Sequence, residues 1–422
     1  MSEEISGVES LAKRAREASR GLASLSTEAK NRALEAIAQN LDDHREEIKK
    51  ANRKDLQAGR DSGLSEALLD RLELTDARID SMVDGVRQVR QLEDPVGEIL
   101  EMKKRPNGLK IGRQRIPLGV IGIIYESRPN VTVDAAILCL KSGNCTLLRG
   151  GSEAKHSNYL LVDLIQEAIR PHLPDNSIQI LRNQDHDLVD EMLGLDDYVD
   201  VIIPRGGEGL IEMVAQKSTM PVIKHYKGVC HTYVSAAADL EMAREICVNA
   251  KTQRPAVCNA METLVVDREL PDDWIVKILA DLEQENVELR CDSYLRDLLH
   301  DTNIETVEVE PADWDKEYLD LTVSVKSVTG ITEAIEHINR HASNHSDAIL
   351  TENYSEAERF LNEIDSAAVY VNASTRFTDG YEFGLGAEIG ISTERLHARG
   401  PMGLRELTIP KYVIYGQGQT RS

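Results

Sequence analysis

Cys258 lies in a polar stretch, KTQRPAVCNAME, between a predicted helix at 238–250 and a predicted strand at 262–266. A cysteine in such a loop belongs neither to an apolar helix face nor to a core strand. Lys251 and Arg254 are close in sequence, and cations favour the thiolate, which is the nucleophilic form of cysteine. From these residues alone, a catalytic nucleophile and an ordinary small buried side chain both remain open.

Two glycine-rich turns, LRGGS and IPRGG, carry an arginine at the end of a predicted strand. Glycine allows backbone N–H groups to approach a phosphate, and arginine neutralises its charge. Neither turn has the GxGxxG spacing of the common dinucleotide fingerprint, and each alone indicates an ordinary tight turn as readily as a phosphate site. Two of them at equivalent ends of one sheet favour a phosphate site, to which Ser152 and Lys155 could add contacts with a ribose 2′-phosphate. The turn residues are Arg149, Gly150, Gly151, Arg205, Gly206 and Gly207.

The segment KHYKGVCH gathers three side chains that could bind zinc, His225, Cys230 and His231. A zinc site needs about four ligands of suitable spacing, and no second cluster in the sequence completes this one. We therefore expect no metal. The nucleophile elbow GxSxG is also absent, so the sequence does not indicate Ser-His-Asp hydrolysis.

Composition limits the classes of partner. The 422 residues are 41% hydrophobic and carry a net charge of −23, which disfavours binding to nucleic acid or to an anionic membrane. No apolar run approaches the roughly 18 residues of a membrane helix, and no export signal is visible. The six cysteines lack paired spacing, which favours reduced thiols in a cytoplasm. Adaptation of the surface to a salty cell interior stays open as an explanation of the net negative charge.

The order of elements predicts an α/β protein. Helical patterns fill residues 1–93, and 97–116 indicates a hairpin with too little apolar surface for a core of its own. From 118 to 224 continuous apolar strands alternate with helices, which is typical of a parallel, doubly wound sheet with ligands at the carboxyl ends of its strands. A second alternating region follows and contains the Cys258 loop, and 407–415 alternates like an edge strand.

Four blocks of sequence carry a family resemblance: residues 116–136, 142–158, 252–266 and 371–404. They closely resemble the gamma-glutamyl phosphate reductases, or glutamate-5-semialdehyde dehydrogenases, within the aldehyde dehydrogenase superfamily. The resemblance implies an aldehyde dehydrogenase-like fold with a cofactor domain, a catalytic domain and a small β oligomerisation element. The implied parts are 1–96 (helices of the cofactor domain), 97–116 (oligomerisation hairpin), 117–228 (Rossmann-like NADP-binding domain), 229–366 (catalytic domain), 367–404 (return to the cofactor domain) and 405–422 (C-terminal strand of the oligomerisation element).

The resemblance also implies a reaction, the NADPH-dependent reduction of L-glutamyl 5-phosphate to L-glutamate 5-semialdehyde, phosphate and NADP⁺ in proline synthesis. Cys258 matches the catalytic cysteine, which would form a thioester that hydride then reduces. Asn130 is the candidate side-chain donor to the oxyanion. His225 stands where hydrolytic relatives place a glutamate base, and this loss of a carboxylate suits an enzyme that excludes water.

Other residues gain expected roles from the same alignment. Glu317 aligns with a glutamate that binds the nicotinamide ribose, and Arg149 stands where the superfamily commonly has a lysine near the adenosine ribose. The expected substrate and phosphate residues are Arg128, His225, Arg254, Asn372 and Arg376, and a salt bridge within the protein stays open as the role of Arg376.

Two alternatives stay open beside this interpretation: another acylating or hydrolytic aldehyde dehydrogenase, and an inactive binding protein on the same fold. The expected partners are the acyl phosphate, phosphate, further copies of the chain and, transiently, a glutamate 5-kinase.

Overall fold

The computed structural model describes residues 7–183, 185, 187–224 and 227–421. The chain forms two compact units. The first comprises Met1–Lys224, Gly384–Gly390 and Met402–Ser422, and the second comprises His225–Phe383 and Ile391–Pro401. Each unit is built around its own parallel sheet, so the α/β class predicted from the sequence is confirmed.

The sheet of the first unit has four parallel strands in its described part, in the order β5-β4-β3-β6. All residues of β3 and β4 are buried, as their continuous apolar sequence predicts for strands covered on both faces. The chain runs from β3 through β4 to β5 on one side and then returns to place β6 on the other side of β3. The strand order therefore reverses between β3 and β6, where open α/β sheets bind ligands. The strands are β3 (Val120–Tyr125), β4 (Cys145–Gly150), β5 (Ile178–Ile180) and β6 (Val201–Arg205).

The alternation of strands and helices over 118–224 predicts a last strand at 222–224, which the structure does not form in full. The segment at 222–224 makes a single bridge, between Ile202 and Val222, rather than a full strand.

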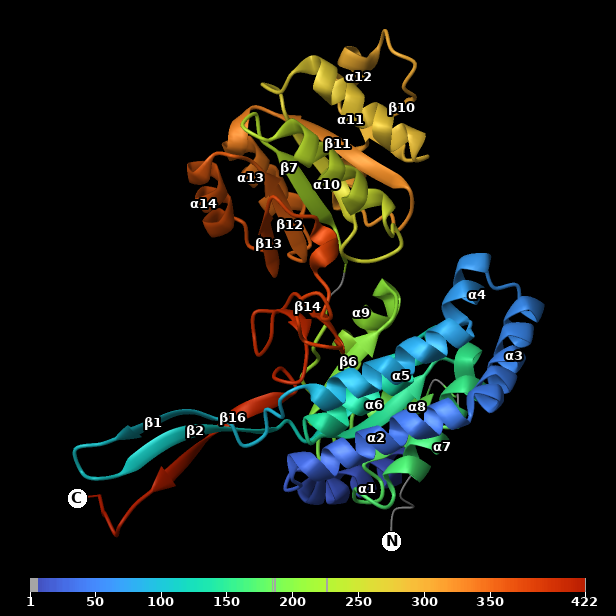
Figure 1. Ribbon diagram of the computed structural model, residues 1–422, viewed down its shortest axis with the longest axis vertical. Helices are drawn as coiled ribbons and strands as arrows, with labels where there is room; N and C mark the ends of the chain where they lie inside the picture. Colours follow the sequence, from blue (N-terminus) through green and yellow to red (C-terminus); the bar gives the residue numbers. More distant parts are fainter. Residues whose placement is uncertain (1–6, 184, 186, 225–226, 422) are drawn as a thin grey trace. The chain divides into compact units, whose positions relative to one another are not determined.

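Helices cover this sheet. A buried lysine joins two of them, α2 and α6, to the segment that follows α5. Lys30 on α2 is fully buried, and its Nζ donates to Asp94 Oδ2 at 2.8 Å and to the carbonyl of Lys141 on α6 at 3.2 Å. Figure 1 shows the helices packed beside the sheet of the first unit. They are α1 (Gly7–Leu22), α2 (Thr27–Asp43), α3 (Arg45–Asp61), α4 (Glu66–Leu72), α5 (Asp76–Gln91), α6 (Asn130–Lys141), η1 (Ser152–Ala154), α7 (Lys155–Ile169), α8 (Asp187–Met192) and α9 (Glu208–Lys217).

A three-stranded antiparallel arm extends from the helices of the first unit (Figure 1). It consists of β1 (Ile99–Lys104), β2 (Lys110–Pro117) and β16 (Thr408–Tyr415), with β2 in the middle. Most of β1 and β16 is exposed or only half-buried, including Ile99 and Tyr412. The arm thus presents apolar side chains that its own three strands do not cover.

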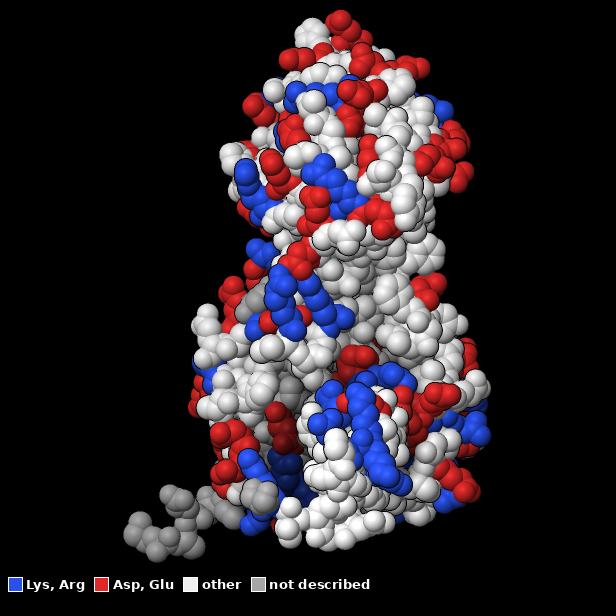
Figure 2. Space-filling model, turned by 90° about the vertical axis from the view of Figure 1, so that its left-hand side faces the viewer, with Lys and Arg blue, Asp and Glu red and all other residues white. Residues whose placement is uncertain are grey.

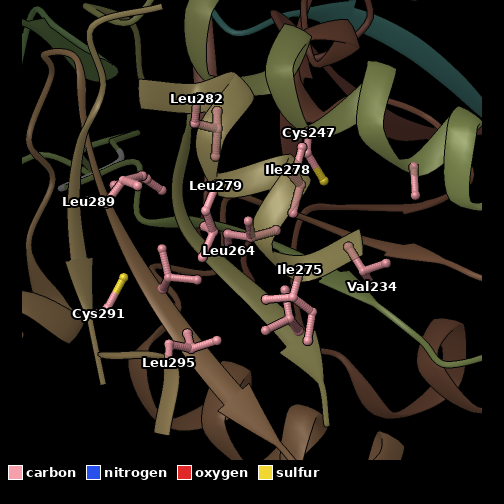
Figure 3. Close-up of a cluster of buried hydrophobic side chains, with 14 of the residues drawn as sticks. Val234, Cys247, Leu264, Ile275, Ile278, Leu279, Leu282, Leu289, Cys291 and Leu295 are labelled. Atoms are coloured by element: carbon pink, nitrogen blue, oxygen red, sulfur yellow. The ribbon is translucent and has the colours of Figure 1, made fainter. Parts of the chain in front are cut away.

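The described sheet of the second unit has seven parallel strands in the order β10-β9-β11-β8-β7-β12-β13. Side chains from α10, α11 and α12 pack on one part of it and form the cluster in Figure 3, which includes Cys247, Leu264 and Ile278. The elements are β7 (Cys230–Val234), α10 (Leu240–Thr252), β8 (Met261–Asp267), α11 (Asp272–Gln284), β9 (Glu288–Cys291), α12 (Ser293–Leu299), β10 (Thr306–Glu308), η2 (Pro311–Asp315), β11 (Thr322–Val328), α13 (Gly330–His341), β12 (Ser346–Leu350), α14 (Tyr354–Glu363), β13 (Ala368–Val371) and η3 (Thr375–Phe377).

The chain returns to the first unit later than the expected boundary at residue 367. Strand β13 pairs with β12 in the second sheet, which keeps the chain in the second unit as far as Phe383. It then crosses between the units within two short strands, β14 (Gly390–Ser392) and β15 (Gly400–Met402). The earlier expected boundary at 228/229 likewise lies at 224/225.

Charged side chains of both signs are interspersed over the described part of the face seen in Figure 2. In the described chain, no helix combines the length and the apolar character needed to span a bilayer. The same residues include no group of three or more His, Cys, Asp or Glu side chains placed to hold a metal ion. None of the six cysteines, all of which lie in the described part of the chain, forms a disulfide.

Candidate active site

Cys258 is partly exposed in the loop that joins α10 to β8 in the second unit. Helix α10 begins at an Asp239 cap and buries Ala243, Cys247 and Ala250, while β8 is buried along its whole length. Both flanking elements are therefore fixed by the core. The short loop between them holds the thiol at the amino end of β8, as the sequence predicts for this position.

A buried ion pair closes this loop at its base. Lys251 Nζ lies 2.7 Å from Glu262 Oε2, and neither side chain is exposed. Strand β8 pairs Met261 with Cys230 and Thr263 with His231, so Glu262 is the extra residue of a bulge. Bulges redirect side chains beside functional sites.

The start of β7 packs directly against the backbone of Cys258. A Cβ placed on Gly228 would lie 1.9 Å from the Cys258 carbonyl oxygen, so only glycine allows this approach. Cys230 Sγ donates to the same oxygen at 3.2 Å. Gly228 N also donates to Glu317 Oε1 at 2.9 Å, which brings the predicted ribose-binding glutamate next to the residue that abuts Cys258.

Two predicted arginines gather near Cys258. Burial lowers the pKa of Arg376, and the charge of Arg254 lowers it further, whereas negative charge at Cys258 and Asp379 raises it. The half-buried Arg376 donates through Nε to Gln253 Oε1 at 2.9 Å and through Nη1 to the side-chain oxygen of Asn259. Both acceptors are neutral amides, so these contacts hold the guanidinium without cancelling its charge.

The predicted substrate residue Asn372 is not part of this group. The carboxamide of Asn372 is engaged at both ends with the backbone of Thr351, at 2.9 Å in each case, and Asn372 has a positive φ of 54°. These contacts favour a structural role that joins the ends of β12 and β13. His225 lies outside the described residues.

In the first unit, the predicted IPRGG turn lies at the point where the strand order reverses. Gly207 N, at the start of α9, donates to Glu126 Oε2 at 3.0 Å. A Cβ on Gly206 would lie 2.3 Å from that oxygen, and Glu126 N donates to the Arg205 carbonyl at 3.0 Å. A carboxylate thus already occupies a helix N-terminus that could bind a phosphate.

In the LRGGS turn, too, side chains of the protein lie directly against the glycines. A Cβ on Gly151 would lie 2.1 Å from the carboxylate of Glu153, which accepts from Ser127 N, and one on Gly150 would meet Asn158 Nδ2 at 2.2 Å. Arg149 is only 7% exposed, and burial lowers its pKa. Ser152 and Lys155 are exposed at the start of η1 and α7.

The two remaining predicted residues, Arg128 and Asn130, lie at the start of α6 in the first unit. The Arg128 carbonyl accepts from Val131 N at 3.1 Å, and Asn130 Nδ2 donates to Asp134 Oδ2 at 3.0 Å. Burial raises the pKa of Asp134 to about 6. The predicted oxyanion donor is therefore engaged within its own helix, and the nucleophile belongs to the other unit.

Comparison with known proteins decides the family. The model of the aldehyde dehydrogenase family matches residues 3–294, more than half of the chain. A gamma-glutamyl phosphate reductase of Carboxydothermus hydrogenoformans is 55% identical over 412 residues, covering 97% of this chain and 98% of that protein. The chain belongs to the gamma-glutamyl phosphate reductases of the aldehyde dehydrogenase family. The resemblance seen in the sequence is confirmed.

Other matches lead to the same family or to the same fold. A gamma-glutamyl phosphate reductase of Halothermothrix orenii is 53% identical over 411 residues and is matched over 97% of both chains. The crystal structure of gamma-glutamyl phosphate reductase from Thermotoga maritima superposes with a TM-score of 0.96 at 48% identity, covering 99% of this chain and 100% of that one. An acetylating aldehyde dehydrogenase from Geobacillus thermoglucosidasius, at 16% identity and a TM-score of 0.72, shares the fold.

The sequence predictions missed four residues that lie around the Cys258 loop in the structure. They are Gly228, Gln253, Asn259 and Glu262. Glu262 and Lys251 had a recognisable signal, because opposite charges flank the loop and one of them opens an apolar strand. The amides Gln253 and Asn259 carry no signal of this kind, since a polar loop residue next to a cysteine is usually solvated.

Proposed function

We propose that this chain catalyses the NADPH-dependent reduction of L-glutamyl 5-phosphate to L-glutamate 5-semialdehyde and phosphate, the second step of proline synthesis from glutamate. The observation that carries the proposal is the position of Cys258, in a loop whose ends are joined by the Lys251–Glu262 ion pair and near Arg254 and Arg376. The relatives of the chain are named gamma-glutamyl phosphate reductases. A partly exposed thiol among cations suits attack on an anionic acyl donor.

The proposed roles of the chain's own residues follow from this placement. The Cys258 thiolate forms a C–S bond to the acyl carbon, and the bond from that carbon to the phosphate oxygen breaks. Phosphate leaves with its electron pair, and a thioester remains on Cys258. Arg254 offsets the charge of the departing phosphate, while Arg376 binds the carboxylate of the substrate. Arg128 and His225 stay proposed as further anion contacts.

An oxyanion forms when the thiolate attacks and again when the thioester is reduced, and it needs preorganised donors. We propose the backbone N–H of Cys258 as one donor and Asn130 Nδ2 as the second. In that role Asn130 would exchange its contact with Asp134 for the oxyanion. Collapse of the second oxyanion releases the aldehyde and returns the thiolate.

The first unit fits a dinucleotide at the reversal of strand order. A Cβ on Gly207 would meet nothing within 4 Å, and the Gly207 N–H donates to a carboxylate oxygen of Glu126 as it would to a phosphate oxygen. We propose that Arg205, Gly206 and Gly207 hold the phosphates, that Arg149, Ser152 and Lys155 surround the 2′-phosphate, and that Glu317 binds the nicotinamide ribose. The bound NADPH supplies the hydride that reduces the acyl group.

We further propose a homo-oligomer joined through the arm of β1, β2 and β16, because that arm exposes apolar side chains such as Ile99 and Tyr412. A cytoplasmic location and transient contact with the kinase that makes the acyl phosphate would both suit a short-lived substrate.

The deciding experiment runs the reaction in reverse with purified protein, glutamate 5-semialdehyde and NADP⁺. Reduction of NADP⁺ should require phosphate or arsenate, and Cys258→Ala should lower its rate roughly a thousandfold or more. Equal rates without either anion would indicate a hydrolytic dehydrogenase instead, and a requirement for a thiol cofactor would indicate an acylating one. Full activity of Cys258→Ala would exclude the thioester.

A further inference from the structure

We propose that Asn259 is a positioning residue that holds Arg376 in place for the carboxylate of the substrate. This inference rests on the proposed function and assigns a role to a residue adjacent to the nucleophile. Asn259 is 5% exposed, although its side chain is polar and lies in a loop. Such burial requires hydrogen-bond partners, and those partners define what the residue does.

One carboxamide contacts both the backbone and the side chain of Arg376. Asn259 Oδ1 accepts from Arg376 Nη1, and Asn259 Nδ2 donates to the Arg376 carbonyl at 3.4 Å and to the Thr378 carbonyl at 2.8 Å. The Asn259 carbonyl also accepts from Thr375 Oγ1 at 2.8 Å. The loop that carries Cys258 is thereby joined to residues 375–378 on either side of the arginine.

This contact is anchored in the second unit. Thr378 Oγ1 lies 2.6 Å from Ser346 Oγ and 2.7 Å from Tyr370 OH, and these two residues belong to β12 and β13. Thr378 is buried. Asn259 therefore connects the guanidinium, through Thr378, to two strands of the sheet.

The chemistry of an amide suits this task better than that of a carboxylate. An aspartate at 259 would neutralise Arg376, and its oxygens would face the carbonyls of Arg376 and Thr378, which cannot donate. An amide accepts from the guanidinium at one end and donates to the two carbonyls at the other. Arg376 keeps its charge for an anion, and Gln253 supports it through a second neutral oxygen at 2.9 Å.

Adjacency in the chain adds a geometric consequence. Because Asn259 follows Cys258 directly, one peptide unit sets the distance between the nucleophile and the group that holds the carboxylate anchor. A substrate bound through Arg376 therefore has its carbonyl placed relative to the sulfur. Loss of the Asn259 side chain should weaken substrate binding more than it slows a saturated enzyme.

The test compares Asn259→Ala, Asn259→Ser and Asn259→Asp in the reverse assay. The KM for glutamate 5-semialdehyde should rise about tenfold in each, as expected for loss of a charge-assisted contact, while the KM for phosphate stays within about twofold. Tyr233→Phe is the control, since it removes a buried hydrogen bond to Asp267 at the carboxyl end of β8 and leaves the contacts of Asn259, Arg376 and Thr378 in place. It should lower thermal stability and leave both KM values unchanged.

A double-mutant cycle separates positioning from a general structural effect. If Asn259 acts through Arg376, then Asn259→Ala should add almost nothing to the KM increase already caused by Arg376→Ala. Additive increases, or wild-type KM values in folded Asn259→Ser, would overturn the positioning role. A rise confined to the KM for phosphate would overturn the assignment to the carboxylate. Lack of phosphate-dependent activity in the wild-type protein would instead overturn the proposed function itself.

Discussion

Lys251 and Glu262 form a fully buried ion pair, with Nζ 2.7 Å from Oε2, across the two ends of the loop that carries Cys258. Burial raises the pKa of Glu262 and lowers that of Lys251, and in both residues their mutual attraction opposes this effect. Glu262 Oε1 also accepts from Leu319 N at 3.2 Å. The pair thus fixes the loop on one side and the segment next to Glu317 on the other.

Removing one partner of this pair should be costly. Glu262→Leu or Lys251→Met leaves a buried charge without its counter-ion, which typically destabilises a protein by about 3–5 kcal/mol. The double variant Lys251→Met/Glu262→Leu should recover most of that loss, because no charge then stays buried. Urea unfolding monitored by circular dichroism measures the free energies. Single and double variants with additive losses would show that the two charges act independently.

Glycine is required at 228 because of its contact with the nucleophile. In Gly228→Ala the new Cβ would overlap the Cys258 carbonyl, only 1.9 Å away, so the loop must shift. We expect a loss of about 1–3 kcal/mol in stability and a lower kcat. Gly209→Ala is the matched control, since a Cβ there meets nothing within 4 Å and helix α9 gains propensity. A Gly228→Ala enzyme with wild-type kcat would contradict the prediction.

Replacing Lys155 should test the preference for NADPH over NADH better than replacing Arg149. Lys155 is exposed, whereas Arg149 is 7% exposed and donates to the carbonyl of Gly150, so its loss also disturbs packing. Lys155→Ala should raise the KM for NADPH about tenfold and leave that for NADH unchanged. The exposed Lys54→Ala on α3 controls for net charge. An unaltered ratio of the two KM values would remove Lys155 from the 2′-phosphate site.

Acid should destabilise the second unit through His345. Burial lowers the pKa of this residue to about 4, although Asp347 opposes the shift, while an unfolded histidine titrates near 6.5. Between these values the unfolded chain binds a proton that the folded chain does not. The free energy of unfolding therefore falls as the pH falls from about 6.5 to about 4, by up to ~1.4 kcal/mol per pH unit from this residue.

Replacing His345 should flatten that pH profile. Urea titrations of wild type and His345→Asn at half-unit steps between pH 7 and pH 4 measure the slope. The control is His300→Asn, at a side chain that is 83% exposed. Parallel profiles for the wild type and His345→Asn would show that other groups account for the acid sensitivity.

The arm provides a prediction about assembly. Ile414 is 60% exposed on β16, and a charge there should prevent burial of the arm against another copy of the chain. Ile414→Glu should lower the mass measured by sedimentation equilibrium, and Tyr354→Glu, at an exposed position on α14, should not. An oligomer of the same mass in Ile414→Glu would place the subunit contact elsewhere.

The sequence predicted most strands of both sheets because fully buried parallel strands are continuous apolar runs, as in β3 and β8. It also placed Cys258 in a loop between the correct elements. The opposite charges of Lys251 and Glu262 at the two ends of the loop gave a signal for their contact, but the irregular pairing of β7 with β8 at Glu262 is not visible in any local pattern. The same holds for Asn372, because its partner Thr351, the residue after β12, is brought to it by pairing between β12 and β13.

The long separation of β2 from β16 along the chain has a consequence for synthesis on the ribosome. Strand β2 pairs with β16 along its whole length, yet about 290 residues separate Pro117 from Thr408. At roughly 5–20 residues per second, the nascent arm keeps one open edge for about a quarter of a minute to a minute. The basic side chains Lys110, Arg113 and Arg115 on β2 would discourage pairing with other nascent chains during that interval.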